Sequence, residues 1–417
     1  MTKIYTKTEP LGLPVLDVFC SLEQRYREKF LYVEKDGRIT VAGLGCLVAE
    51  QALTVLPHEF SGSIRRSPIM FVAGMFDPDD SKHRNSLFRA LEGSTYVLPE
   101  LVLIEEGGRS FVQVNSTGPI PDGAIETIVA ESNPCALRSR EIPFTLILDS
   151  RQEWFADVEE ALRRIRADEF HKIVLARELR VETEAVFTSA QMVANLLAAR
   201  SGGTLILHEI DGVFFIGATP ELLVSKRGST ITTMCLAGTT AAGESQEERA
   251  AGAAFLLGDE KNLREHAYVV DHLTRCLSDA CSALEMPESP GILALRHVQH
   301  LCTPVTGTVA EDVSITELRD RLHPTPALAG SPVEEAKAAI REMEGFNRGF
   351  YGGPFGFVDF EGNGEFSVAI RSGVFTRDYG YVYAGCGIVE GSDPAAEYDE
   401  IDVKLKTILS AFQGEAR

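Results

Sequence analysis

The sequence lacks a long apolar run and is short of basic residues. No stretch of the 417 residues approaches the roughly 20 apolar positions that a membrane-spanning helix needs, and no secretory signal opens it. Lysine and arginine together number 40 against 61 acidic residues, which gives a formal net charge of -21. Such an acidic balance disfavours binding to nucleic acid or to anionic lipid. We therefore expect a cytoplasmic protein that binds neither nucleic acid nor a membrane.

The sequence also lacks the cysteine patterns of metal-binding and disulfide-rich proteins. Its eight cysteines form no CxxC pair and no Cys/His set with the spacing of zinc ligands. In a chain of this length, reduced and mostly buried thiols are the default expectation. The length is enough for a substantial core, arranged as two or three average domains or as one large α/β or α+β unit.

What the sequence does have is a concentration of polar chemistry between Phe366 and Lys406. This segment holds an arginine inside an apolar run, two closely spaced glycines, several carboxylates and a lysine. Its patterning predicts strands over 366–375 and 381–386, then a glycine-rich bend and a helix. Ser392 or Asp393 can cap that helix, because each offers a side-chain oxygen to the first free backbone N–H groups.

The predicted helix carries its polar residues on one face. Glu397, Glu400 and Lys404 are spaced i, i+3 and i+7, beside an apolar stripe that includes Ile401 and Leu405. The simplest interpretation is a solvated face with a weak ion pair between Glu400 and Lys404. The alternative is that the two carboxylates hold a divalent cation next to the core.

The strand before this helix favours the second interpretation. Arg371 interrupts the apolar run VAIRSGVF, where a guanidinium is costly unless it meets an anion. Gly385 and Gly387 are expected to expose backbone N–H groups just before the helix N-terminus, which gives a second place for an anion. The pattern therefore predicts a small ligand that carries more than one carboxylate.

The runs VAIRSGVF, YAGCGIV and SDPAAEYDEIDVKLK resemble the C-terminal block of the chorismate-utilising enzymes. That family includes the isochorismate, salicylate, anthranilate and aminodeoxychorismate synthases, whose substrate has a ring carboxylate and an enolpyruvyl carboxylate. The resemblance implies that Arg371 holds the enolpyruvyl group, and that Gly385, Gly387 and Lys404 hold the ring carboxylate. It also implies that Glu400 binds Mg²⁺, with Glu397 nearby.

Lys172 begins the predicted strand HKIVLARELRVE, at 171–182. A lysine at the start of a strand is usually a surface residue. The isochorismate and salicylate synthases have lysine here, in a phrase similar to KVVLAR, whereas the members that add ammonia have glutamine. A lysine can take a proton from water and a glutamine cannot. The resemblance thus implies that Lys172 activates water, and no glutamine amidotransferase subunit is expected.

Two further glutamates acquire roles from the resemblance. Glu221, in the phrase ATPELLV, corresponds to the family's general acid for the departing C4 hydroxyl. Glu265, in KNLREHAYVVD, corresponds to a magnesium ligand that acts together with Glu400. The pattern predicts one long helix over 247–284 around Glu265, and it puts this glutamate opposite an apolar stripe. The members of that stripe are Leu263, Ala267, Val270, Leu273 and Leu277.

The remaining residues implied to bind substrate come from four segments. They are Gly238 and Thr239 in LAGT, His300 in HVQHLCTPVTGTV, Ala327 and Leu328 in LHPTPALAG, and Tyr351 in the segment that also holds Arg348. As a lone histidine, His300 is more often structural, and Arg348 is interpreted as structural. Ala237 stands where the aminodeoxychorismate synthases have a lysine nucleophile, which argues against that branch.

The resemblance covers about residues 150–415 and implies an α+β fold with a large antiparallel, β-sandwich-like core surrounded by helices. Residues 1–150 are expected to form a divergent β-rich part and residues 151–417 the chorismate-binding catalytic part of the same unit. The implied activity is magnesium-dependent isochorismate synthesis for siderophore, menaquinone or salicylate production, by a monomer or weak homodimer. A salicylate synthase, which also eliminates pyruvate, and a non-catalytic chorismate-binding relative stay open; Lys172 disfavours anthranilate synthesis.

Overall fold

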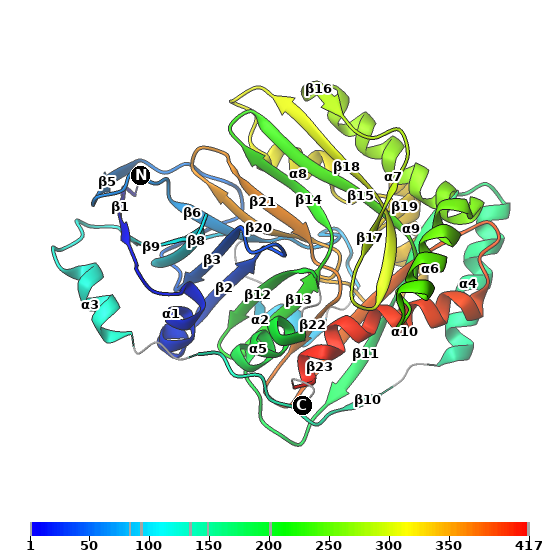
Figure 1. Cartoon of the computed structure of the whole chain (residues 1–417), viewed down its shortest axis with the longest axis horizontal. Helices are drawn as coiled ribbons and strands as arrows, with labels where there is room; N and C mark the ends of the chain where they lie inside the picture. Colours follow the sequence, from blue (N-terminus) through cyan, green and yellow to red (C-terminus); the bar gives the residue numbers. More distant parts are fainter. Residues whose placement is uncertain are drawn as a thin grey trace.

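Two large β-sheets form the core of the computed structural model (Figure 1). The structure describes residues 2–82, 85–91, 95–132, 136–147, 150–199 and 202–414. All strand pairings in this described part are antiparallel except that of β1 with β5. Helices cover the outer faces, so the predicted α+β class and the large antiparallel core are confirmed.

The first sheet has 13 strands within the described residues. In spatial order they are β10 (Thr145–Ile147), β11 (Lys172–Glu182), β23 (Tyr379–Val389), β22 (Ser372–Phe375), β13 (Val213–Thr219), β12 (Thr204–Ile210), β2 (Glu28–Val33), β3 (Ile39–Leu44), β8 (Leu101–Glu106), β9 (Arg109–Ser116), β1 (Ile4–Pro10) and β5 (His58–Ser61), while β19 (Gly330–Ser331) pairs with β11. Strands from both ends of the chain therefore share this sheet.

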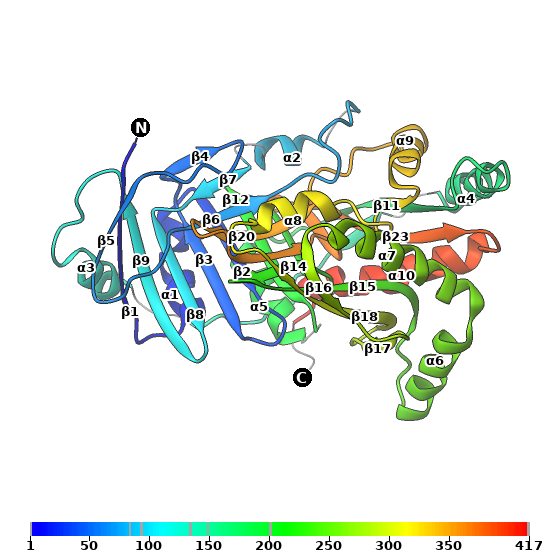
Figure 2. The same cartoon turned by 90° about the horizontal axis from the view of Figure 1, so that it is seen from above.

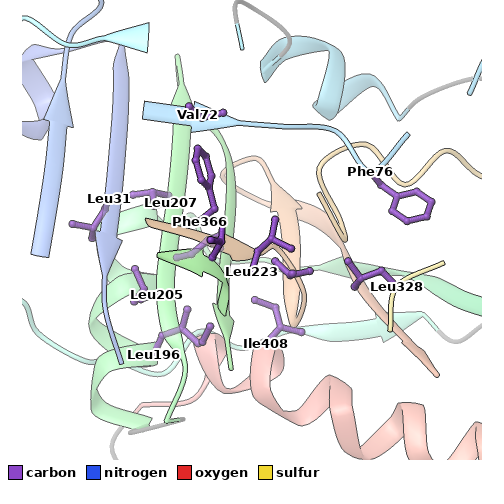
Figure 3. Packing of buried hydrophobic residues seen from close by; sticks show 14 of the residues in the cluster. Leu31, Val72, Phe76, Leu196, Leu205, Leu207, Leu223, Leu328, Phe366 and Ile408 are labelled. Carbon is purple, nitrogen blue, oxygen red and sulfur yellow. The ribbon is translucent and has the colours of Figure 1, made fainter. Parts of the chain in front are cut away.

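The second sheet has 10 strands in the same described ranges. They run β16 (Cys281–Glu285), β18 (Val298–Val309), β15 (Thr230–Ala241), β14 (Leu222–Arg227), β21 (Gly364–Val368), β20 (Pro354–Asp359), β6 (Ile69–Ala73), β7 (Tyr96–Leu98) and β4 (Val48–Glu50), with β17 (Gly291–Ala294) beside β18. The two sheets pack face to face, because Leu31 and Leu207 of the first sheet and Val72 and Phe366 of the second belong to one buried cluster (Figure 3).

Helices flank the sheets at both ends of the molecule (Figure 2). They are α1 (Val15–Leu22), α2 (Ser86–Leu91), α3 (Ala124–Glu131), α4 (Arg151–Arg166), α5 (Ser189–Ala199), α6 (Gln246–Gly258), α7 (Glu260–Ser278), α8 (Ile315–Leu322), α9 (Val333–Met343) and α10 (Pro394–Leu409), with short 3₁₀ turns η1 (Glu23–Arg25) and η2 (Ser410–Phe412). Among the described residues, none of these helices has both the length and the apolar character needed to cross a membrane.

The long helix predicted over 247–284 is wrong. Asp259 ends α6 and caps α7, with its side chain accepting a hydrogen bond from the Asn262 backbone N–H, and the last residues of the range form β16. A new N-cap is favourable only where a helix begins, so this aspartate divides the helical pattern into two.

The strand predicted over 366–375 is also wrong as a single element. It consists of β21 in the second sheet and β22 in the first, so the chain passes from one sheet to the other at Ala369–Arg371. Arg371 has φ 52°, a left-handed conformation that side-chain-bearing residues rarely adopt. This turn in the backbone places the guanidinium between the two sheets.

The cysteines are less buried than expected. Seven of them lie among the described residues, whereas Cys135 lies outside those residues. Only Cys235 and Cys386 are buried, and Cys46 is exposed. The expectation of mostly buried thiols is therefore wrong for the described residues, because four of the seven cysteines are only partly buried.

Candidate active site

One cavity lies where β11 and β23 of the first sheet approach β15 and β18 of the second, under α7 and α10. Its lining residues are Val174, Glu221, Leu236, Ala237, Gly238, Thr239, Glu265, His300, Ala327, Leu328, Arg348, Tyr351, Gly352, Ile370, Arg371, Ala384, Gly385, Cys386, Gly387 and Lys404. The elements that form it lie in the half of the molecule away from β1 and β5 (Figure 2).

The structure brings almost all of the predicted site residues to this cavity. Those that line it are Glu221, Gly238, Thr239, Glu265, His300, Ala327, Leu328, Tyr351, Arg371, Gly385, Gly387 and Lys404. The other two, Lys172 and Glu400, each contact a lining residue. Lys172 Nζ lies 3.1 Å from Glu265 Oε1, and Lys404 Nζ lies 2.6 Å from Glu400 Oε1. Their shared location is established, and their individual roles remain predictions.

Lys172 is a fully buried ammonium rather than a surface residue. Its side chain is 0% exposed, and its Nζ makes no hydrogen bond of acceptable geometry within the described chain. Burial works to raise the pKa of Glu265, but the ammonium groups of Lys172 and Lys404 outweigh it and hold that pKa below its usual value. Glu265 is thus a carboxylate whose charge keeps the buried lysine in place.

The placement of Glu265 corrects the predicted face of its helix. The buried face of α7 consists of Asn262, His266, Val269, Leu273 and Leu277. This face is rotated from the predicted stripe because Ala267 is exposed and Leu263 is only partly buried. The polar Asn262 and His266 are buried through hydrogen bonds, since His266 contacts Thr303 Oγ1 at 2.8 Å. Glu265 therefore lies beside the buried face, not opposite to it.

Glu221 is a buried carboxyl group in the short link between β13 and β14. Its backbone holds it there, since Glu221 N donates to Thr219 Oγ1 and Val368 N donates to Glu221 O. Burial raises the pKa of Glu221 to about 7, although Lys172, Arg371 and Lys404 oppose the shift. Near neutral pH, a large fraction of Glu221 is thus protonated and able to donate a proton into the cavity.

Arg371 is buried without an acidic partner. Its side chain donates to His300 Nε2 at 2.9 Å and to Thr407 Oγ1 at 3.3 Å, and it forms no ion pair within the described residues. Burial lowers the pKa of Arg371 to about 10, and Tyr351, Glu400 and Glu221 offset only part of this effect. A guanidinium without an acidic partner has hydrogen-bond donors available for an anion.

His300 keeps a neutral imidazole beside that guanidinium. Burial lowers the pKa of His300 well below its ordinary value, and the charge of Arg371 lowers it further. Because Nε2 accepts from Arg371, the geometry assigns the ring proton to Nδ1, which lies 3.0 Å from Thr239 Oγ1. His300 thus orients Arg371 without adding a second charge.

Gly385 and Gly387 were expected in a bend before a helix, but they lie inside β23. A Cβ on Gly387 would stand 2.4 Å from Glu265 Oε1 and 2.8 Å from Lys172 Cε. A Cβ on Gly385 would stand 2.7 Å from Leu175 O. The prediction of their backbone setting is wrong because the strand continues to Val389, so these glycines serve the cavity by leaving room for other side chains.

Three carboxylates gather where α7 meets α10. Burial raises the pKa of the Cys386 thiol, and Glu397, Glu400 and Glu265 raise it further, so all three lie around this residue. Glu397 pairs with Lys261, and burial followed by the charge of Glu400 raises the pKa of Glu397. Within the described residues, no three His, Cys, Asp or Glu side chains are arranged as a metal cage.

This set of donors nevertheless fits Mg²⁺. Magnesium is commonly bound by one or two protein carboxylates, with water and substrate oxygens completing its octahedron. Glu265 and Glu400 are such carboxylates, and neither is accompanied by the histidine or thiolate ligands that zinc prefers. Their ammonium partners, Lys172 and Lys404, show that these carboxylates already neutralise cations in this structure.

Arg348 is a cavity residue that sequence reasoning assigned only a structural role. It is 3% exposed and lines the cavity, while its guanidinium is paired with Glu344. The i, i+4 spacing of Glu344 and Arg348 was the available signal, although such spacing usually marks a surface pair. The apolar lining residues Val174, Leu236 and Ile370 gave no signal, because core and cavity walls have the same residue types.

Comparison with known proteins agrees with this site. A profile of the family described as "Chorismate binding enzyme" matches residues 2–413. Isochorismate synthase MenF of Bacillus subtilis is 35% identical over 358 residues, which cover 84% of this chain and 76% of that protein. The salicylate biosynthesis isochorismate synthase of Pseudomonas aeruginosa is 39% identical over 262 residues, or 63% of this chain and 55% of the relative.

The fold is shared with a solved structure. The menaquinone-specific isochorismate synthase MenF of Escherichia coli superposes with a TM-score of 0.80 at 24% identity, covering 98% of this chain and 95% of that one. At this level of identity the match establishes the architecture and not the activity. Together, the cavity, the fold and the family profile show that the chain belongs to the chorismate-binding enzyme family.

Proposed function

We propose that this protein is a magnesium-dependent isochorismate synthase, which converts chorismate to isochorismate by adding water at C2 and releasing the C4 hydroxyl. The observation that carries the proposal is the pairing, around one cavity, of a buried lysine with a carboxyl group whose pKa is about 7. Those are the base and the acid that the reaction needs, and they are the two residues that were predicted to be catalytic.

The charges of the cavity suit a dicarboxylate substrate. Arg371 has no acidic partner among the described residues, so it is available to the enolpyruvyl carboxylate. Lys404 is anchored by Glu400 and donates to Gly385 O at 3.0 Å, which keeps its ammonium beside the expected ring carboxylate. Glu265 and Glu400 would hold the magnesium ion, which supplies neutralisation of negative charge on the ring carboxylate.

The proton transfers balance across the reaction. Lys172 acts as the base in its neutral amine form, after the ammonium that pairs with Glu265 has lost a proton, and it takes one proton from water as the oxygen bonds to C2 of the ring. The ring double bonds shift, the C4–O bond breaks, and Glu221 gives its proton to the leaving hydroxyl, which departs as water. Water is consumed and released once, so the product is an isomer of the substrate.

We further propose the cytoplasm as the site of action, with a monomer or weak homodimer and no amidotransferase subunit. Lys172 supports the last point, because a water-activating lysine has no use for ammonia delivered by a partner. Relatives are named a salicylate biosynthesis and a vibriobactin-specific isochorismate synthase, and a similar solved structure is named menaquinone-specific. We propose that the product serves a menaquinone, salicylate or siderophore pathway.

The test is to incubate the purified protein with chorismate and Mg²⁺, with and without a chelator, and to separate the products by chromatography. Isochorismate that accumulates without pyruvate, and only with metal, is the expected result. Salicylate with pyruvate would replace the proposal by a salicylate synthase. Chorismate binding by calorimetry without any product would replace it by a binding protein.

A further inference from the structure

The cavity wall contains a buried ion pair whose hydrogen bonds run within the pair and to backbone groups. Arg348 Nε donates to Glu344 Oε2 at 2.8 Å, and Nη2 donates to Glu344 Oε1. Both side chains are almost completely buried, with exposures of 3% and 4%. A buried pair of this kind is costly to desolvate, and replacing it with apolar residues is often neutral for stability. Its presence therefore calls for another explanation.

The pair completes an interrupted edge of β11. One edge of this strand pairs with β23 from Lys172 to Glu182, whereas on the other edge β19 pairs only with Lys172 and Ile173. Just beyond β19, Val174 N still donates to Ala329 O at 2.8 Å, and the ion pair bonds two further backbone groups on that edge. Arg348 Nη2 donates to Val174 O at 2.7 Å, and Ala176 N donates to Glu344 Oε1 at 2.8 Å.

The same guanidinium also holds the loop that follows α8. Arg348 Nη1 donates to Leu328 O at 2.9 Å, and Leu328 lines the cavity. Four of the five N–H groups of Arg348 are engaged by protein acceptors. Arg371, by contrast, uses only two in this structure. Arg348 is thus committed to the protein scaffold and is not a second substrate receptor.

We propose that Arg348 and Glu344 are positioning residues, which set β11 and the Leu328 loop relative to each other so that the Lys172 amine reaches the attacking water. Where β19 no longer pairs with β11, the Arg348 side chain supplies a donor to Val174 O and the Glu344 side chain an acceptor for Ala176 N. These two hydrogen bonds replace those that a neighbouring strand would make. Lys172 lies two residues before Val174 on this strand, so a shift of Val174 moves the amine. A misplacement of about 1 Å costs on the order of 100-fold in rate.

The inference rests on the proposed function and is tested by comparing variants with the wild-type rate. Glu344→Leu removes the acceptor for Ala176 N and the partner of Arg348, whereas Glu344→Gln keeps an oxygen for both. We expect kcat to fall about 100-fold in the leucine variant and less than about tenfold in the glutamine variant. KM for chorismate should stay within about twofold in both, because Arg371 and Lys404 are untouched.

A matched control separates positioning from stability. Glu209→Leu breaks another buried pair, in which Lys29 Nζ lies 2.8 Å from Glu209 Oε1, outside the lining of the cavity. All variants are compared per folded molecule, with folding checked by circular dichroism. The control should keep its kcat.

Several results would overturn the proposal. One is a glutamine variant as slow as the leucine variant, and another is a KM that rises as much as kcat falls. A third is an equal loss of kcat in the Glu209→Leu control. Arg348→Lys, which retains one donor, serves if Glu344→Leu does not fold, and wild-type kcat in that variant would also contradict the proposal. A wild-type protein that makes no isochorismate refutes the proposed function instead, and that result is separate.

Discussion

The two parts of the chain build the same two sheets but treat buried charge differently. In the first 150 residues, the buried Lys29 is matched to Glu209 at 2.8 Å, and Ser189 donates to the same carboxylate. In the second part, Lys172 has an ion-pair partner but no hydrogen bond, and Arg371 has no described acidic partner. Every residue that lines the cavity lies between 174 and 404. Lys172 and Arg371 at the cavity thus lack a complete set of partners, whereas the buried pairs Lys29–Glu209 and Arg348–Glu344 are fully matched and serve the scaffold.

The largest effect is expected where the unsatisfied lysine is removed. Lys172→Gln should reduce kcat by on the order of 10²–10⁴, since a general base is lost and an amide of similar length fills the space. Product chromatography measures the rate, and calorimetry with chorismate checks that binding survives. A rate equal to that of the wild type would show that the incompletely paired lysine is not needed for the reaction.

The matched pair in the scaffold should respond in stability instead. Lys29→Met leaves Glu209 as a buried charge without its cation, which should lower the free energy of unfolding by about 3–5 kcal/mol. Urea unfolding gives this value, and the turnover per folded molecule should be unchanged. If turnover fell with stability intact, the scaffold would not be separate from the site.

The carboxyl group of Glu221 should make both the stability and the activity of the protein depend on pH. Its pKa is about 7 when folded and 4.5 as a free side chain, so the protonated form is favoured by folding. The stability that this provides is full below pH 4.5 and is lost as the pH rises through 7, by about 3 kcal/mol. Activity should also decline above pH 7, because the acid is deprotonated.

Glu221→Gln is the control for that prediction. An amide does not titrate, so the fall in unfolding free energy between pH 4.5 and pH 8 should be smaller in the variant by about 3 kcal/mol. Chemical denaturation at several pH values measures this difference. The same pH dependence of stability in both proteins would show that Glu221 does not titrate near neutral pH.

The smallest effect is expected at the anion receptor. Arg371→Gln should raise KM for chorismate by about 10-fold to 100-fold, since hydrogen bonds to a charged group contribute about 1.5–3 kcal/mol. Arg177 is a matched buried arginine, which pairs with Asp402 at 2.8 Å outside the cavity. Arg177→Gln should leave KM unchanged. Equal increases in KM in both variants would contradict the prediction that Arg371 binds the anion of the substrate.

Local patterns in the sequence predicted the elements that carry strong periodicity. The capped start of α10 at Asp393 and the burial of Ile401, Leu405 and Ile408 are confirmed. The strand predicted at 171–182 is also confirmed, as β11. In each of these, one face is buried by many neighbours, so the spacing of apolar residues records the contact.

Long-range placement could not be predicted in the same way. The sequence VAIRSGVF has continuous strand propensity, but membership in a sheet depends on partners far along the chain, so the passage between sheets at Arg371 left no local signal. The burial of Lys172 had none either, because its counter-charge, Glu265, lies 93 positions later in the sequence. Resemblance to a family identified the site residues, and the structure gave their burial, hydrogen bonds and ion pairs.

The passage of the chain at Ala369–Arg371 has a mechanical consequence. Arg371 follows β21 of the second sheet and precedes β22 of the first, and it is bonded to His300 in the second sheet and to Thr407 on α10. An anion held by this guanidinium would therefore be connected to both sheets and to α10. Bound substrate would link the two sheets at this point. The relative position of the sheets would then be best defined when the cavity is occupied.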